Sequence, residues 1–176
     1  TKWIDQGAKW ETRWAYIAPK KQNIPEVSRK YEELKFVNNP IDNFIAARMA
    51  DVSIFPNKPA AKNLIARRAA FDITGLPPGK KIYNDFLDNK ISYEQYIDQL
   101  FNSVGYGENW ASWWLDFARY ADTNGYEADR GRIIWRYRDW VIDAFNQDKP
   151  FDEFTIEQLA GDLLPNPSVD QFIATA

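Results

Sequence analysis

The sequence predicts an all-α fold, an irregular bundle of about seven helices with an aromatic-rich, extended N-terminal arm. Three observations indicate this class. Apolar residues recur at helical spacing through most of residues 39–176, capping patterns precede several of these stretches, and no stretch alternates long enough to suggest a sheet. With 176 residues, 45% of them hydrophobic and 16% aromatic, the chain can bury a sizeable core.

Residues 1–38 are predicted to be an arm that packs on the body, and residues 39–176 form the helical part of what is a single domain overall. Prolines at 19 and 25 oppose a long helix, so we expect a short helix or an extended strap. Its aromatics, which should contact the body, are Trp3, Trp10, Trp14 and Tyr16. Because the chain starts at Thr1 without a Met or a leader, we expect a segment of a longer protein.

The first three helices of the body have readable boundaries. Asn39 can cap a helix that starts at Pro40 and reaches about Asp51. A second helix is expected from about Ala60 to Gly75, where the glycine and two following prolines form a stop. A short third helix is marked by Ile82, Phe86 and Leu87.

The fourth and fifth helices are expected to be separated by glycines. Ser92 and Gln95 form a capping-box pattern for a helix that reaches about Val104. Gly105 and Gly107 should then interrupt the chain before a fifth helix, from about residue 108, that carries apolar residues as far as 121.

Two further helices complete the predicted bundle. A sixth runs from about Ile134 to Asn146, and a seventh, which Asp152 could cap, runs to Pro165. The fifth and sixth helices should be adjacent. Their large aromatics are predicted to be buried: Trp110, Trp114, Phe117, Trp140 and Phe145.

Composition excludes several function classes. The chain has no Cys and no His, so it offers no disulfide, no CxxCH haem attachment and no imidazole chemistry. Its net charge is −3 and its basic residues form no long block, which argues against a nucleic-acid partner. No apolar run approaches the roughly 20 residues of a membrane span. We therefore expect no cofactor within this chain.

The densest group of charges lies on and between the fifth and sixth helices. Its members, taken together as a candidate binding cluster, are Asp116, Arg119, Asp122, Glu127, Asp129, Arg136, Arg138 and Asp139. Two interpretations stay open: a charged pocket floor, or an ion-pair network that fixes how the helices cross. In either case at least one of the three arginines should be buried and paired with a carboxylate, because a lone buried charge is too costly.

A loop within this group suggests an oxygen-ligand metal site or a capped turn. Asp122, Asn124 and Asp129 surround Gly125 and offer the oxygens that a hard cation such as calcium prefers. The loop fails the EF-hand template, and a turn with left-handed Asn124 and Gly125 accounts for the same composition.

Carboxylates and aromatics also raise glycan chemistry. Asp116, Asp122, Glu127 and Asp129 are the cluster from which a glycosidase pair could come. Aromatics that fall off the clearest apolar stripes, and that could stack on sugar rings, are Trp3, Trp10, Trp113 and Trp135. The alternative is that these side chains belong to the core.

Eight stretches together resemble a known family. In chain order they are residues 39–45, 64–68, 71–78, 106–108, 114–122, 137–142, 144–146 and 158–162. From about Trp14 onward the sequence is similar to the planctomycete-type cytochrome-associated domain of unknown function, family 1549.

The resemblance implies a module of large exported bacterial proteins that often carry a c-type cytochrome module. It has no established catalytic residues to transfer. The family's CxxCH-like motif lies downstream of the stretch that ends here, so haem c is expected only on flanking segments. The expected function is a non-catalytic helical scaffold, located in the periplasm or at the cell surface, whose partners are other domains or chains, some haem-bearing. The alternative is a glycan-binding or glycan-active domain with carbohydrate as its ligand.

Overall fold

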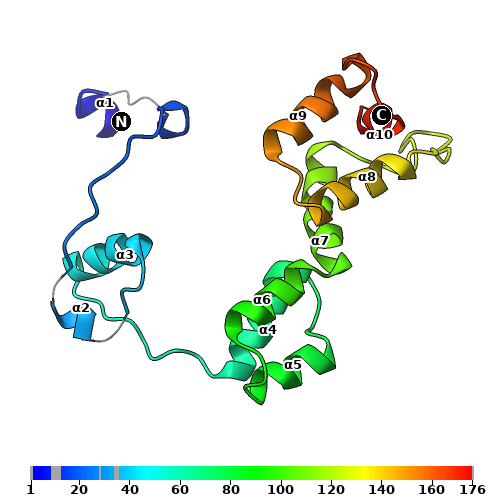
Figure 1. The fold of residues 1–176 in the computed structure, drawn as a ribbon. Coiled ribbons are helices and arrows are strands. Elements are labelled where there is room, and N and C mark those ends of the chain that lie inside the picture. The colour runs from blue at the N-terminus through cyan, green and yellow to red at the C-terminus, as the bar shows by residue number, and fades with distance from the viewer. Residues whose placement is uncertain (1, 9–12, 28, 34–35, 176) are drawn as a thin grey trace. The chain divides into compact units, whose positions relative to one another are not determined.

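A computed structural model describes residues 2–8, 13–27, 29–33 and 36–175 (Figure 1). Within those residues the fold is all-α, as predicted, and the one β feature is an isolated bridge between Thr123 and Gly131. The elements are α1 (Lys2–Asp5), η1 (Trp14–Tyr16), α2 (Arg29–Glu33), α3 (Pro40–Asp51), α4 (Lys62–Thr74), α5 (Lys80–Leu87), α6 (Tyr93–Phe101), α7 (Val104–Phe117), α8 (Trp135–Asn146), α9 (Phe151–Ala160), η2 (Gly161–Leu163) and α10 (Val169–Ala174). None of the helices described in these ranges is long and apolar enough to cross a membrane.

The chain divides into two compact units, Thr1–Pro59 and Ala60–Ala176. In the first, Asn39 caps α3 through a complete capping box with Asp42, as the sequence indicates. Tyr31 is buried against Phe55 and donates a 2.6 Å hydrogen bond to the carbonyl of Ile54.

The aromatics predicted to grip the body lie in this first unit. Trp3, Trp14 and Tyr16 are exposed within it, and Trp10 lies outside the described residues. The division into residues 1–38 and 39–176, with the arm packed on the body, stays a prediction.

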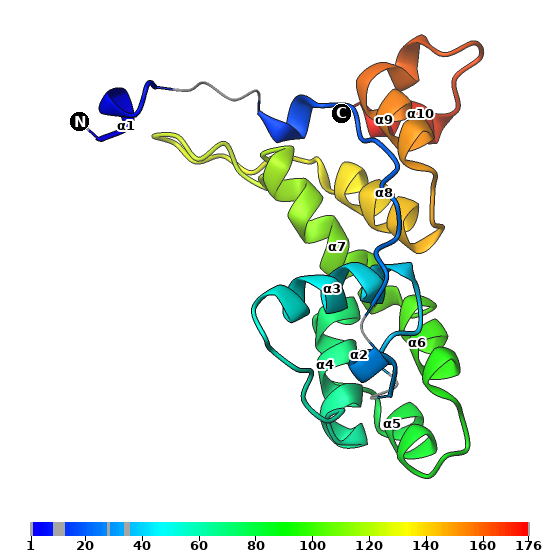
Figure 2. The same ribbon diagram turned by 90° about the vertical axis from the view of Figure 1, so that its left-hand side faces the viewer.

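Helices α4, α5 and α6 pack around one apolar cluster (Figure 2). The face that α4 buries consists of small residues, Ala66, Ala69 and Ala70, so the aromatic rings of Phe86 and Tyr96 can approach it closely. The two rings stack with centroids 4.9 Å apart. Gly75 ends α4 in a left-handed conformation and Ser92 starts α6 with a capping box to Gln95, as predicted. Helix α6 ends at Phe101, however, and does not reach Val104.

Helix α7 begins at Val104 rather than near residue 108, so Gly105 and Gly107 lie inside its first turns. The predicted glycine break was wrong, and the reason is packing against α8. A β-carbon on Gly107 would lie 2.5 Å from the carbonyl oxygen of Ile142, and the Gly107 amide donates a 2.8 Å hydrogen bond to Asn146 Oδ1. The glycine is needed for the close approach of the two helices, which are adjacent as predicted.

The burial predicted for the aromatics of these helices was only partly correct. Trp140 is buried, and Trp114 and Phe145 are half-buried. Trp110 and Phe117 are exposed, because α7 turns its small residues, including the fully buried Ala111, toward α8. The helix also ends at Phe117, before residue 121.

The C-terminal helices differ from the prediction in the start of α9 and in the presence of an additional helix, α10. Helix α9 starts at Phe151 after Pro150, so Asp152 lies in its first turn and does not cap it. An unexpected helix, α10, follows Pro165 and starts with a capping box between Ser168 and Gln171. Together with α7 and α8, these helices enclose the second apolar cluster, centred on Trp140, Val141 and Phe154.

Candidate functional site

The polar interior of the α7–α10 region is organised by one amide side chain. Gln158 Oε1 accepts hydrogen bonds from Trp114 Nε1 (2.8 Å) and from the Tyr137 hydroxyl (2.7 Å), while its Nε2 donates to the carbonyl of Ala174 (2.8 Å). One residue of α9 thereby connects to α7, α8 and α10. Burial raises the pKa of Tyr137, so this hydroxyl keeps its proton and acts as the donor.

A polar groove of about 390 Å³ lies beside this connection, between α8 and the segments that follow it. It is lined by Trp135, Arg136, Asp139, Trp140, Asp143, Ala144, Gln147, Lys149, Glu157, Ser168, Asp170 and Ile173. The aromatic wall, together with several carboxylates, gives the groove the composition of a site for a polar ligand.

The groove is supported by an ion pair that is largely buried. Lys149 Nζ lies 2.6 Å from Glu157 Oε2, with the two side chains 21% and 13% exposed, and Gln171 Nε2 donates to Glu157 Oε1 at 3.1 Å. Burial alone would raise the pKa of Glu157, but the hydrogen bonds from Lys149 and Gln171 outweigh it and hold that pKa below its ordinary value. Glu157 is therefore an ionised structural partner of Lys149.

The predicted charged cluster is only partly assembled. Arg138 donates to Asp139 Oδ1 from Nη2 (2.8 Å) and Nε (3.0 Å), and the Tyr120 hydroxyl donates to Asp122 Oδ1 at 2.5 Å. Burial, and then the hydrogen bond to Asp122, raise the pKa of Tyr120, whose ring stacks on that of Tyr137.

The prediction that one arginine of this cluster is buried was wrong: all three arginines are described, and none is buried. The side chains of Arg138 and Asp139 are 41% and 45% exposed, and Arg119 and Arg136 are exposed as well. A half-exposed pair between sequence neighbours needs no buried counter-charge, because water solvates both groups.

The other members of the predicted cluster lie apart. Arg136 and Asp139 line the polar groove. Asp116, Glu127 and Asp129 are exposed, and none of them lines the polar groove. The structure thus gathers Asp122, Arg138 and Asp139 around Tyr120, and Arg136 lines the groove; the other members of the cluster lie exposed elsewhere.

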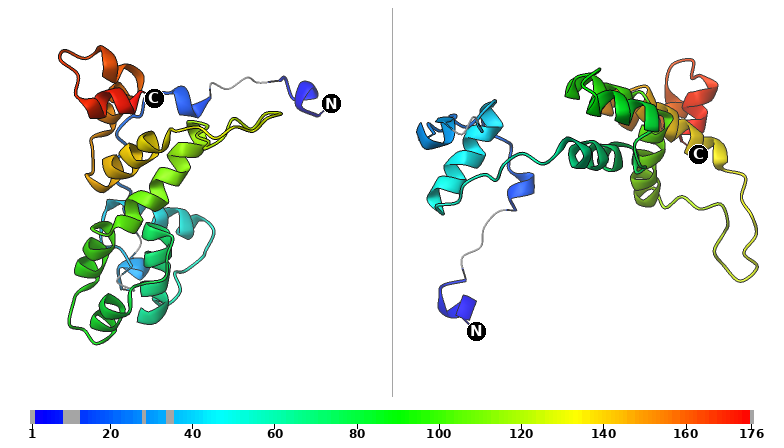
Figure 3. Two further views of the ribbon diagram at one scale, coloured as in Figure 1. Left: turned by 90° about the vertical axis from the view of Figure 1, so that its right-hand side faces the viewer. Right: turned by 90° about the horizontal axis from the view of Figure 1, so that it is seen from below.

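The loop proposed for a metal is an exposed hairpin that extends away from α7 and α8 (Figure 3). The amide of Asn124 donates to the carbonyl of Arg130 (3.0 Å) across it. At its tip the Asp129 carboxylate accepts a hydrogen bond from the Gly125 amide (2.9 Å), and hydrogen bonds from Thr123 and from that amide lower the pKa of Asp129. These contacts are those of a capped turn in which Gly125, with φ of +62°, is left-handed.

The predicted metal ligands of this loop are Asp122, Asn124 and Asp129. Across the described ranges, no three His, Cys, Asp or Glu side chains gather closely enough to share a metal ion. Asp122, Asn124 and Asp129 include an amide, so they stay a prediction.

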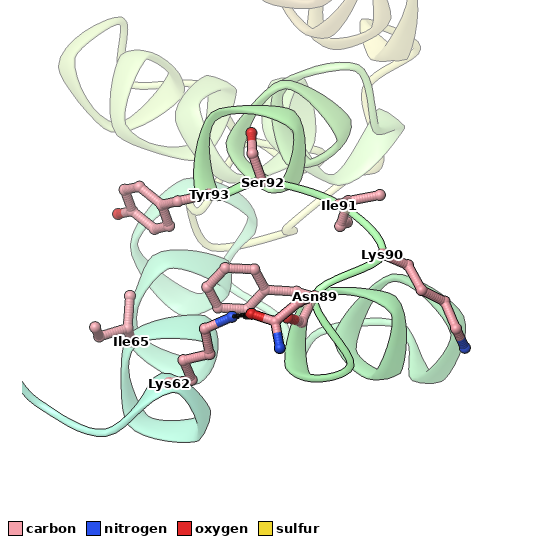
Figure 4. Close-up of a pocket in the computed structure, with 8 residues that line it drawn as sticks. Lys62, Ile65, Asn89, Lys90, Ile91, Ser92 and Tyr93 are labelled. Carbon is pink, nitrogen blue, oxygen red and sulfur yellow. Dashed lines mark hydrogen bonds between the residues drawn. The ribbon is translucent and has the colours of Figure 1, made fainter.

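A second cavity lies in the α4–α6 region. It is an apolar pocket of about 760 Å³ between α4 and the α5–α6 connection (Figure 4). It is lined by Lys62, Ile65, Phe86, Asn89, Lys90, Ile91, Ser92 and Tyr93. Lys62 Nζ lies 4.8 Å from the ring centre of Phe86 and donates to Asn89 Oδ1 at 2.5 Å and to the Phe86 carbonyl at 3.3 Å. Sequence reasoning missed this pocket, because its residues come from three segments with no shared motif.

Comparison with models of protein families identifies the family of this chain. The model of the family described as PSCyt2, protein of unknown function (DUF1549), matches residues 40–176. The chain belongs to this family. Neither the curated proteins nor the solved structures contain a significant match.

Two positions in one stretch that resembles the DUF1549 family, residues 158–162, have clear structural roles. Gln158 is the amide that connects four helices, and a β-carbon on Gly161 would lie 2.3 Å from the carbonyl oxygen of Gln171. Sequence reasoning missed both roles. The capping box of Ser168 and Gln171 was the signal that would have revealed α10 and hence the partner of Gly161.

Proposed function

We propose that this DUF1549 domain is a non-catalytic helical packing module of an exported, extracytoplasmic multidomain protein, and that its partners include c-type cytochrome domains. The observation that carries the proposal is an apolar stripe on the outer face of α7. Trp110, Trp113 and Phe117 follow one another at i, i+3 and i+7, so they share a face, and Trp113 and Phe117 are 64% and 82% exposed.

Such a stripe is unusual on a surface that faces only water. Single exposed apolar residues are common, but large aromatics in a row mark surfaces that another protein covers. Trp in particular is enriched where interfaces concentrate binding energy. The stripe also belongs to a helix that Gly107 and Ala111 hold closely against α8, so it is presented on a rigid support.

The polar groups of this region support a structural interpretation. Gln158 bonds to groups on three other helices, and Glu157 bonds to Lys149 and Gln171, so these side chains hold segments of the region together. In the described part of the chain, no buried side-chain nitrogen or oxygen lacks a partner. Neither observation points to a group held ready for a reaction.

The test uses the complete product of the gene, made in a host that attaches haem c. Haem quenches tryptophan fluorescence over short distances, so emission from Trp110 and Trp113 should be lower in this protein than in the isolated chain. Replacing Trp113 and Phe117 by Ser should release the domains from each other, which is measured as a larger hydrodynamic radius with unchanged helical circular dichroism.

A matched control is Tyr126→Ser, since Tyr126 is as exposed as Phe117 but lies on the hairpin. This variant should leave the radius unchanged. Equal radii for the stripe variant and the parent protein, with no difference in tryptophan emission, would refute the proposal.

The alternative, a glycan-binding domain, is favoured by one observation at the polar groove. Trp135 is half-exposed there, beside the carboxylates of Asp139, Asp143 and Asp170, and an exposed indole next to acceptors suits the apolar face and hydroxyls of a sugar. Calorimetric titration with cello- and chito-oligosaccharides tests it. Binding that Trp135→Ala abolishes and Trp113→Ala leaves intact would support this function, and no heat with either sugar series would exclude these ligands.

A further inference from the structure

The pocket between α4 and the α5–α6 connection combines apolar walls with a lysine, Lys62, whose two hydrogen-bond acceptors are neutral. Its walls are the side chains of Ile65, Phe86, Ile91 and Tyr93. Its volume of about 760 Å³ lies within the range of about 300–1,000 Å³ that small-molecule sites occupy.

Lys62 is the residue that gives the pocket its charge. Its ammonium is directed across the pocket toward Asn89 (Figure 4), and both of its hydrogen-bond acceptors, the amide of Asn89 and the carbonyl of Phe86, are neutral. Within the described residues no carboxylate pairs with it. An ammonium has three donors, so one N–H stays available to a ligand.

The residues around Lys62 make the electrostatic potential in the pocket more positive. Lys62 is the first residue of α4, a 13-residue helix whose N-cap, Ala61, supplies no side-chain hydrogen bond. The amide end of the helix dipole is therefore not compensated by a capping side chain. Lys90, the other cation of the wall, is already paired, with Asp88 at 2.9 Å and Asp85 at 3.7 Å.

We propose that this pocket binds a small amphipathic monocarboxylate, an acid with an apolar chain or ring, whose carboxylate pairs with Lys62. The apolar part lies against the ring of Phe86 and the side chains of Ile65 and Ile91. A neutral apolar molecule would fill the same walls without pairing with the ammonium, so the carboxylate provides the selectivity. This site is independent of the α7 stripe and of the packing function.

The experiment compares decanoate with 1-decanol, which has the same chain length and no charge. Both are titrated into the 176-residue chain below their aggregation limits, and NMR signals of the Ile65 and Ile91 methyl groups report occupancy. Decanoate should bind at least tenfold more tightly than decanol. Lys62→Met should remove that preference, while Lys81→Met, at an exposed lysine outside the pocket, should keep it.

A second variant tests the same proposal if Lys62→Met does not fold. Tyr93→Glu places a negative charge at the pocket wall, on the first residue of α6, where a carboxylate is favourable for the helix. The ratio of decanoate to decanol affinity should fall about tenfold. Methyl signals that do not move with decanoate, or equal affinities for decanoate and decanol in the parent chain, would overturn the proposal.

Discussion

The α4–α6 region and the α7–α10 region close their cores by different means. In the first, alanines of α4 meet the stacked rings of Phe86 and Tyr96, and only one buried side-chain hydrogen bond, from Tyr96 to the carbonyl of Ala66, crosses the interface. In the second, glycines bring backbones into contact, and Gln158 ties the helices together through polar bonds. The first core therefore depends on apolar packing and the second on geometry that single atoms decide.

The difference predicts unequal tolerance to substitution. Apolar packing degrades gradually, because neighbouring side chains relax into a changed volume. A part-buried amide that bridges three partners has no partial replacement, since each lost bond leaves a group without a partner. Four experiments test this contrast, and in each the α4–α6 region or a neutral site supplies the control.

The largest effect is expected from Gln158→Leu. It leaves Trp114 Nε1, the Tyr137 hydroxyl and the carbonyl of Ala174 without their partner, and each such group costs about 1–3 kcal/mol. We expect a loss of about 4 kcal/mol in the free energy of unfolding, measured by urea denaturation. Tyr96→Phe, which removes the single bond of the other core, should cost about 1 kcal/mol. Similar losses for the two variants would contradict the contrast.

The next effect is expected from Gly161→Ala. The added β-carbon would overlap the carbonyl oxygen of Gln171, a backbone atom that cannot rotate away, so overpacking should cost about 2–3 kcal/mol. Gly79→Ala is the control, because nothing lies within 4 Å of its β-carbon position and its φ is ordinary. The control should change stability by less than about 0.5 kcal/mol. A stable Gly161→Ala protein would show that α10 moves freely against α9.

A smaller effect is expected from acid. The pKa of Glu157 is lowered in the folded chain, so the Lys149 pair stabilises the fold above the unfolded pKa and is lost as pH falls through the folded value. Stability should therefore decline as pH falls from the ordinary glutamate range through the lower pKa of folded Glu157, until the carboxylate is fully protonated. Glu157→Gln should remove this part of the pH dependence, whereas Asp85→Asn in the α4–α6 region should leave it. Parallel pH curves for Glu157→Gln and the parent chain would show that the pair contributes nothing.

The smallest effect is expected from the two Ser-x-x-Gln capping boxes. Ser92→Ala removes the cap of α6 and Ser168→Ala that of α10, and each should cost about 1 kcal/mol. Capping is local, so the two losses should be equal despite the different cores. A clearly larger loss for Ser168→Ala, measured by thermal unfolding, would indicate that the cap also positions Gln171 against Glu157.

Local signals in the sequence were enough to predict the fold class and most helix boundaries. Asn39, Gly75 and Ser92 each act on their own neighbours, so their roles are readable within a few residues. Gly107 was misread, because its role depends on Ile142 and Asn146, which are remote in sequence. The same error placed Trp110 and Phe117 in the core, because the prediction assigned burial to the large aromatics of α7 and not to its glycine and alanine.

The candidate sites were less predictable for a related reason. The sequence indicated that Asp122, Arg138 and Asp139 belong to one charged group, and the structure brings them around Tyr120. It could not indicate their exposure, which depends on how far α8 lies from other elements. The apolar pocket and the Gln158 connection were not predicted, because each is built by segments whose approach only the fold determines.

The hairpin between α7 and α8 makes the molecule easy to label. Its exposed tip contributes to neither core, and the chain has no cysteine of its own. A single Ala128→Cys substitution would therefore place one thiol, unique in the sequence, at a position where added groups meet no neighbour in the core. A fluorophore or spin label attached there would act as a distance gauge from this domain to any molecule that binds it.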